Sequence, residues 1–316
     1  MRRTVIYYAS DVHGSDKCFR KFLNAAKFYG AGVLVMGGDI LGKAIVFLEE
    51  IRPGVYAARQ HERTVELTTA AELDAFEKNA ADAGLYPYRC QPGEPEHLRE
   101  TGEVEKLFER LMYERLRAWM ALADERLAGS GVRCYIMGGN DDPPEALAAL
   151  RASQLVEDPD ERVVRLDDSS EMISLGWSNP TPWNTPRECS EEELGRRIDA
   201  LMAQVSRPEA SVLNLHVPPY ASGLDDAPEL DAALKVQTSL GQTRFKPVGS
   251  TAVRAAIERY QPLLGLHGHV HEAHAITRIG RTVCINPGSD FGEGVLHGAL
   301  ATLDGGKLKG YQMVSG

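Results

Sequence analysis

The N-terminal segment constrains the fold more than any other part of the chain. Residues 4–9 and 33–36 are apolar runs with strand character, and residues 15–29 between them place apolar side chains at helical spacing. Ser15 is a suitable N-cap for this helix, and Gly30 is a suitable C-terminal stop. Two strands joined by one helix predict a parallel βαβ unit, in which the carboxyl ends of both strands meet at one edge of a sheet.

Five strand-like segments end in side chains that can bind a metal, each beside a glycine or a turn. In D-x-H and H-x-H, two ligands lie two residues apart and point to the same side of an extended strand end. A mixed set of carboxylate, amide and imidazole donors without cysteine fits Mn, Fe, Zn or Ni better than a structural zinc site rich in cysteine. Each segment alone is common, so the hypothesis depends on their joint occurrence. The segments are Asp11-Val12-His13, Gly38-Asp39, Gly139-Asn140, His216 and His269-Val270-His271.

The order of these segments resembles the calcineurin-like metallophosphoesterase superfamily. Its pattern of D-x-H, G-D, G-N-H-D, a single H and G-H-x-H is matched between residues 11 and 271, with Gly139-Asn140-Asp141-Asp142 as the third motif. His216-Val217-Pro218-Pro219 and residues 249–254 resemble the branch related to bacterial cyclic-nucleotide phosphodiesterases, the Icc-like proteins. The resemblance implies an α/β fold, a four-layer α/β/β/α sandwich with a helical insert.

The resemblance also implies a dinuclear metal centre, with manganese favoured. One metal would take Asp11, His13, Asp39 and His271, and the other would take Asp39, Asn140, His216 and His269, with Asp39 bridging. A hydroxide between the metals would attack phosphorus, and the catalytic residues would be Asn140, Asp141 and His216. The expected enzyme is a hydrolase of phosphodiesters or nucleotide-like esters. The alternative is a non-catalytic metal-binding scaffold with the same fold.

The chain departs from the family pattern beside the metal ligands. Asp141 stands where many relatives have the histidine that acts on the leaving group. Asp141 is either a carboxylic acid with a raised pKa or a residue that supports or caps the site. The absence of the histidine predicts that the enzyme prefers substrates with good leaving groups. Gly42 replaces an acidic residue, and Lys43 beside it either reaches a phosphate or is solvated, the interpretation that we favour.

The spacing between two motifs predicts an insert within a single domain of residues 1–316. Asn140 follows Asp39 by 101 positions (140 − 39), far more than a short βα connection needs. We therefore expect residues 45–129 to form an inserted cap, which is either a substrate lid or a packing surface that could support a homo-oligomer. His61 and His97 in this insert are expected at the surface.

Three further residues are candidates for substrate binding. Trp183 and Arg187 lie in a proline-rich loop that could stack a base and clamp a phosphate, although a rigid structural loop is the alternative. Arg254 lies in the first turn of a helix that Ser250 caps, where backbone N–H groups could bind an anion; ordinary capping is the alternative.

The composition of the chain restricts the kinds of molecule it can bind and the compartment in which it is expected. A net charge of -10 argues against a protein that coats nucleic acid, while two bound cations would still attract a small phosphoester. The five cysteines are scattered and odd in number, as in a reducing compartment, and no apolar stretch is long enough for a membrane span. We therefore expect a cytoplasmic protein.

Overall fold

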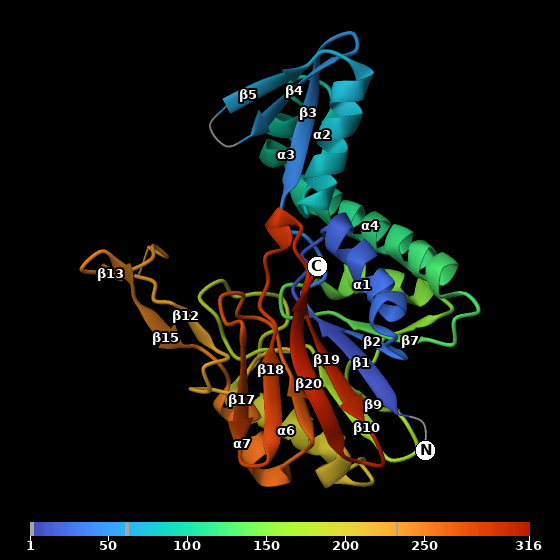
Figure 1. Cartoon of the computed structure of the whole chain (residues 1–316). Helices are drawn as coiled ribbons and strands as arrows, with labels where there is room; N and C mark the ends of the chain where they lie inside the picture. The colour runs from blue at the N-terminus through green and yellow to red at the C-terminus, as the bar shows by residue number, and fades with distance from the viewer. Residues whose placement is uncertain (1–2, 61–62, 232) are drawn as a thin grey trace.

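The computed structural model describes residues 3–60, 63–231 and 233–316 as a mixed α/β protein (Figure 1). Its first large sheet has the strand order β20-β19-β1-β2-β7-β8. In chain order these strands are β1 (Thr4–Ala9), β2 (Val33–Gly37), β7 (Arg133–Met137), β8 (Val156–Glu157), β19 (His297–Leu303) and β20 (Leu308–Ser315). His61 lies outside the described residues, and His97 is exposed as expected.

The predicted βαβ unit is confirmed at the start of the first sheet. Strand β1 pairs in parallel with β2, and helix α1 (Asp16–Tyr29) connects them. The hydroxyl of Ser15 accepts a hydrogen bond from the Cys18 amide at 3.2 Å, and Gly30 ends the helix in the left-handed region at φ 64°. Both caps therefore act as the sequence predicts.

The second large sheet has the order β17-β18-β16-β11-β10-β9. Its central strands β10, β11, β16 and β18 run parallel to one another, whereas the edge strands β9 and β17 pair antiparallel with β10 and β18. The strands are β9 (Arg162–Arg165), β10 (Glu171–Leu175), β11 (Val212–Leu215), β16 (Leu264–Leu266), β17 (Ala275–Ile279) and β18 (Thr282–Asn286).

Apolar clusters hold the two sheets and their helices together. Ile6 and Val33 from the first sheet share one buried cluster with Met172, Val212 and Leu264 from the second. Helices α1 and α4 (Val104–Leu127) share a cluster with the first sheet, while α6 (Glu191–Met202) and α7 (Thr251–Tyr260) share one with the second. Each buried side chain of this size contributes about 1.5–3 kcal/mol of transfer free energy. The arrangement is compatible with an α/β sandwich.

A smaller four-stranded sheet, which we call the peripheral sheet, stands apart from the two large sheets (Figure 1). Its order is β5-β4-β3-β6, and Leu48, Ala58, Leu67 and Leu73 form a small core of its own. Its elements are β3 (Ile45–Arg52), β4 (Val55–Gln60), β5 (Arg63–Leu67), α2 (Ala70–Asp82), β6 (Tyr86–Cys90) and α3 (Glu94–Thr101). Helix α4, which falls within the predicted insert, instead packs against the first large sheet.

Residues 226–231 and 233–247 form a projection, which we call the arm (Figure 1). Its short strands are β12 (Asp226–Pro228), β13 (Thr238–Ser239), β14 (Gln242–Thr243) and β15 (Phe245–Pro247), paired β12 with β15 and β13 with β14. The remaining short helices are α5 (Pro144–Leu147), η1 (Ala148–Ala152), η2 (Pro208–Ala210) and η3 (Phe291–Glu293). No helix in the described part of the chain combines the length and hydropathy needed to cross a membrane.

Candidate metal centre

Two loops of the first sheet are joined by backbone hydrogen bonds where β1 and β2 end. Asp11, His13 and Asp39 in these loops have φ values of 56°, 38° and 48°, in the left-handed region that side chains with a Cβ rarely adopt. Such a conformation costs about 1–3 kcal/mol for each residue unless its surroundings enforce it. The enforcing bonds run from the amides of Asp11, His13 and Gly14 to the carbonyls of Gly38, Asp39 and Ile40, at 2.9, 3.0 and 2.8 Å.

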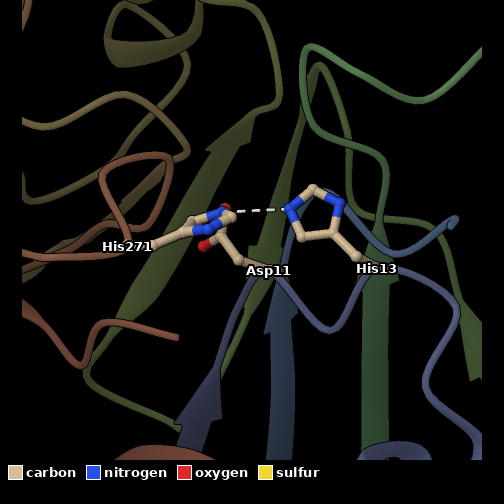
Figure 2. A group of neighbouring side chains, drawn as sticks. All are labelled: Asp11, His13 and His271. Atoms are coloured by element: carbon tan, nitrogen blue, oxygen red, sulfur yellow. Dashed lines mark hydrogen bonds and ion pairs between the residues drawn. The ribbon is translucent and has the colours of Figure 1, made fainter. Parts of the chain in front are cut away.

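Asp11, His13 and His271 form the first group of side chains that could hold a metal (Figure 2). His13 Nε2 lies 3.0 Å from His271 Nε2, and Asp11 Oδ1 lies 3.5 Å from the same His271 atom. The other ring nitrogen of His13 faces the Leu41 carbonyl at 3.3 Å, which orients Nε2 toward the group. Donors bound to one cation at about 2.0–2.2 Å are themselves about 3 Å apart, so the spacing suits a metal.

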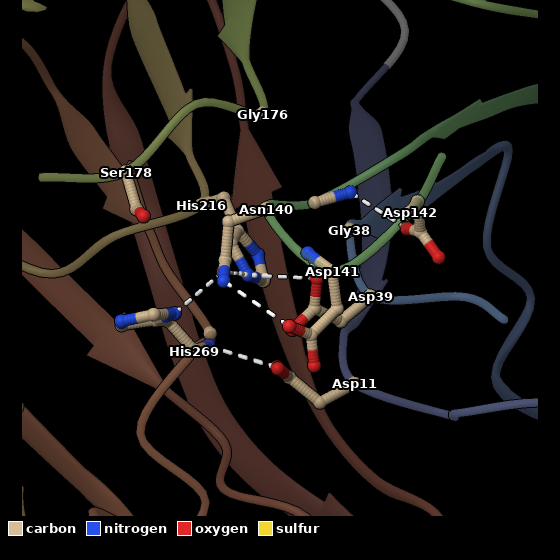
Figure 3. A network of polar contacts seen from close by, with 12 residues as sticks. Asp11, Gly38, Asp39, Asn140, Asp141, Asp142, Gly176, Ser178, His216 and His269 are labelled. Atoms are coloured by element: carbon tan, nitrogen blue, oxygen red, sulfur yellow. Dashed lines mark hydrogen bonds and ion pairs between the residues drawn. The ribbon is translucent and has the colours of Figure 1, made fainter. Parts of the chain in front are cut away.

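Asp39, His216 and His269 form the second group (Figure 3). Asn140 lies among them, with its Oδ1 3.1 Å from His216 Nε2 and 2.7 Å from His269 Nδ1. The Nδ1 of His216 is 2.9 Å from the Gly37 carbonyl, so its Nε2 points into the group. His269 also has a left-handed backbone, at φ 68°.

Asp39 lies between the two groups. Its Oδ1 is 3.3 Å from His216 Nε2, and its Oδ2 is 3.9 Å from His13 Nε2. The Asp141 amide donates to Oδ1 at 3.0 Å and fixes the carboxylate. One side chain therefore presents an oxygen to each group, and the structure brings all seven predicted ligands together.

The ionisation of His13, His269 and Asp11 suits metal binding, whereas neighbouring carboxylates raise the pKa of His216 and His271. Burial lowers the pKa of His13 to about 3 and that of His269 to about 4, so both imidazoles are neutral at pH 7, the form that binds metals. Burial opposes ionisation of Asp11, yet its hydrogen bond with His271 and nearby histidine charges bring its pKa to about 2. The buried groups of aspartate and histidine could therefore bind metal ions.

Asp141 borders the site and pairs with Lys43. The Lys43 side chain is 54% exposed, in agreement with the favoured interpretation of a solvated lysine, and its Nζ also forms an ion pair with Asp141 Oδ2 at 2.5 Å. Burial and the charge of Asp39 raise the pKa of Asp141, while the hydrogen bond and charge of Lys43 act in the opposite direction. The ammonium group thus offsets a negative charge that would repel a phosphate.

Asp142 supports the site in a way that we did not predict from the sequence. Its fully buried carboxylate accepts hydrogen bonds from the amides of Ile40, Leu41 and Gly139 at 2.9, 2.8 and 2.7 Å. Burial and the charge of Asp39 raise its pKa to about 7. Asp142 ties the loop after β2 to the loop after β7, and its place as the last residue of the third motif was the available signal.

Gly42 explains the second departure from the family pattern. A Cβ at this position would overlap the Gly84 carbonyl oxygen, and the Gly42 amide donates to the Tyr86 hydroxyl at 2.9 Å. An acidic side chain does not fit there, because the connection between α2 and β6 occupies the space. The peripheral sheet therefore contacts the loop that carries Asp39.

A cavity of about 500 Å³ opens beside the two groups. Of the three residues predicted to bind substrate, only Trp183 lies among its described lining residues. Trp183 lines it and is 62% exposed. Arg187 is instead buried, pairs with Asp160 and donates to the Gly139 carbonyl at 3.1 Å, so it supports the Asn140 loop. Arg254 donates to the carbonyls of Tyr220 and Ala221 at 2.9 and 3.0 Å and does not line the cavity.

Comparisons with known proteins show similarity of fold. No family model matches the chain. It is 31% identical over 151 residues to the uncharacterized protein MJ1162 of Methanocaldococcus jannaschii. The match covers 47% of this chain and 61% of MJ1162, so it spans less than two thirds of that relative's length. Protein TT1561 of Thermus thermophilus matches with a TM-score of 0.50 and 14% identity over 100% of this chain and 99% of its own. A further crystal structure matches with a TM-score of 0.59 and 16% identity over 99% of both chains.

Proposed function

We propose that this protein is a metal-dependent phosphoesterase with the four-layer α/β/β/α arrangement of the calcineurin-like metallophosphoesterases, in the Icc-like branch. The observation that supports this most strongly is the position of Asp39, whose two carboxylate oxygens face two separate aspartate and histidine groups. Two adjacent cations at the rim of a cavity are suited to an in-line displacement at phosphorus. The proposed substrate is a phosphodiester or a nucleotide-like phosphoester.

The proposed ligands divide as the geometry groups them. Asp11, His13 and His271 would hold one metal, His216, His269 and Asn140 would hold the other, and Asp39 would bridge. When bound, two divalent ions, with manganese favoured, would supply an activated water and neutralise charge on the phosphoryl group. The protein's own part is to fix the donors through strained, hydrogen-bonded loops and to keep the two buried imidazoles neutral.

Asp141 and Lys43 are the residues that we propose interact with the leaving group. Both line the cavity, and their ion pair presents ammonium N–H donors to it rather than a bare carboxylate. We propose that this pair takes the place that the family's histidine occupies. Hydrogen bonding from an ammonium group stabilises a developing oxyanion, but a strongly basic amine is a weaker proton donor at pH 7 than an imidazolium. Poor leaving groups are therefore expected to react slowly.

For residues 45–129 we propose a packing role. None of the described residues that line the cavity falls in this range, so a lid formed by the peripheral sheet lacks support. The sheet instead abuts the metal loops at Gly84, and its outer surface remains a candidate for contact between copies of the chain.

Hydrolysis of bis(4-nitrophenyl) phosphate by the purified protein with added Mn²⁺ tests the proposal. The variants Asp39→Asn and His216→Gln should lose at least about 100-fold in activity, because each removes a ligand of the proposed centre. Asp168→Asn, which changes a highly exposed carboxylate, is the matched control. If none of Mn, Ni, Co and Zn supports turnover, the phosphoesterase proposal is excluded. Metal binding without turnover would favour the alternative of a non-catalytic metal-binding scaffold.

A further inference from the structure

The cavity beside the metal groups is lined by two chemically different sets of residues. One set is charged or able to bind a metal and includes Asp39, Asn140 and Lys43. The other set, which we call the apolar wall, consists of Trp183, Ala227, Pro228, Leu230, Val236 and Val248. Apart from Trp183 and Val248, these residues belong to the arm. A volume of about 500 Å³ falls within the range of small-molecule sites.

The apolar wall is firmly connected to the metal loops. The buried carboxylate of Asp225 accepts hydrogen bonds from the amides of Ala221 and Gly249 at 2.8 and 3.0 Å, which closes the base of the arm. The Asn286 amide nitrogen lies 3.1 Å from the Leu224 carbonyl and 2.9 Å from the Val270 carbonyl. Val270 separates His269 from His271, so one buried asparagine joins the segment that leads into the arm to the loop of the metal ligands.

The chemistry of the wall selects its occupant. Among the described residues that line the cavity, Lys43 is the single lysine or arginine, and Asp141 already pairs with it. A second phosphate against the wall would lose its hydration without gaining a partner. A flat apolar ring would instead bury its surface against Trp183 and the aliphatic side chains, with Trp183 able to stack on it.

We infer that the apolar wall binds the organic group of the substrate, and that this group is an uncharged aromatic or similarly flat apolar ring rather than a second phosphate. The inference deepens the proposed phosphoesterase function and rests on it for the identity of the phosphoryl group. The metal groups would hold the phosphoryl oxygens, and the arm would set the preference for the ester substituent.

Binding of two non-hydrolysable phosphonates to the Mn²⁺-loaded protein tests this inference. Phenylphosphonate and methylphosphonate carry the same anionic group and differ in apolar area, so calorimetry isolates the contribution of the wall. Phenylphosphonate should bind about tenfold more tightly, and Trp183→Ala and the double variant Leu230→Ser with Val236→Ser should each reduce this ratio to about two- or threefold. These wall residues are exposed or half-buried, so the variants should fold.

Leu240→Ser is the matched control, because Leu240 lies on the same arm, is fully exposed and does not line the cavity. It should retain the full preference. Equal affinity for the two phosphonates, no binding of phenylphosphonate, or a preference that survives in the wall variants would overturn the inference. Failure of the proposed function has a different signature: the preference persists while bis(4-nitrophenyl) phosphate is not hydrolysed with any metal.

Discussion

His216 and Asp39 form a buried ion pair in the metal-free protein. Burial alone would lower the pKa of His216, but the charge of Asp39, 3.3 Å away, raises it to about 9. A histidine whose folded pKa exceeds its unfolded value of about 6.5 stabilises the fold fully below pH 6.5. This contribution is lost as the pH rises from 6.5 through 9. The same proton must leave before His216 can bind a cation.

Metal binding near pH 7.5 should therefore release about one proton from His216. Titration of the metal-free protein with Mn²⁺ in two buffers of different ionisation enthalpy measures this release. The apparent affinity should rise by up to about tenfold for each pH unit between 6.5 and 9. The His216→Gln variant should release about one proton fewer, and identical proton release by the variant and the unsubstituted protein would contradict the assignment.

Asp141→His should change how the rate depends on the leaving group. An imidazolium can protonate a leaving oxygen near neutral pH, and general acid catalysis contributes about 10²–10⁴-fold. We expect turnover of alkyl and phenyl phosphoesters to rise by at least about tenfold, with little change for 4-nitrophenyl esters, which need no acid. A series of leaving groups measures the slope, and an unchanged slope would show that Asp141 does not limit protonation.

At the scale of elements, local signals predict more than pairings between distant segments. Helix α1 has both caps and its apolar spacing in one short stretch, so its bounds follow from sequence alone. The ion pair of Lys43 with Asp141 and the pairing of Arg187 with Asp160 join residues that are far apart in the chain. Neither partner carries a local signal of the other, so the sequence leaves Arg187 open between a phosphate clamp and a rigid structural loop, and the ion pair with Asp160 favours the structural loop.

The candidate site was predictable to the same extent. Its ligands follow strand ends beside glycines, and strand ends meet in a parallel sheet, so their convergence could be expected from the motifs. The apolar wall could not be predicted, because the short strands of the arm lack the apolar alternation typical of a sheet. The residues of the arm line the cavity only because of their position in the tertiary structure.

The contact between the peripheral sheet and the metal loops makes Gly84 a sensitive position. A Cβ there would overlap the carbonyl oxygen of His13, and φ is 86°. Gly54 has a similar φ of 75° but open space around its Cβ position. Gly84→Ala should therefore destabilise the protein by roughly 1–3 kcal/mol more than Gly54→Ala. Both substitutions introduce a similar backbone strain, but only the alanine at position 84 also overlaps the His13 carbonyl oxygen.

Denaturant unfolding measures this difference, and Mn²⁺ affinity provides a second readout. Because His13 lies in the displaced loop, Gly84→Ala should also weaken metal binding, whereas Gly54→Ala should leave it unchanged. Equal effects of the two substitutions on both measurements would show that the peripheral sheet does not constrain the metal loops.

At the scale of the molecule, the candidate metal ligands come from both large sheets. Asp11, Asp39 and Asn140 follow strands of the first sheet, and His216 and His269 follow strands of the second. A cation held by either group therefore joins the two sheets at one edge. Its binding stabilises the folded state as a whole, because the unfolded chain does not assemble the donors.

Chelation should lower the unfolding temperature of the metal-loaded protein. Free Mn²⁺ at one hundred times its dissociation constant contributes about 2.7 kcal/mol. For a chain of this size the shift should be about 4 °C for one such ion, measured by thermal unfolding with and without EDTA. Asp39→Asn should show little further change on chelation, and a full shift in that variant would place the stabilising ion elsewhere.

The position of the ligands along the chain has a consequence for synthesis on the ribosome. His271 follows Asp11 by 260 positions (271 − 11), and β1 finds its partner β19 later still. At about 5–20 residues per second, His271 emerges on the order of tens of seconds after Asp11. Until then the first ligands are exposed as an incomplete set, so the nascent chain must finish most of its length before it can hold a cation in this site.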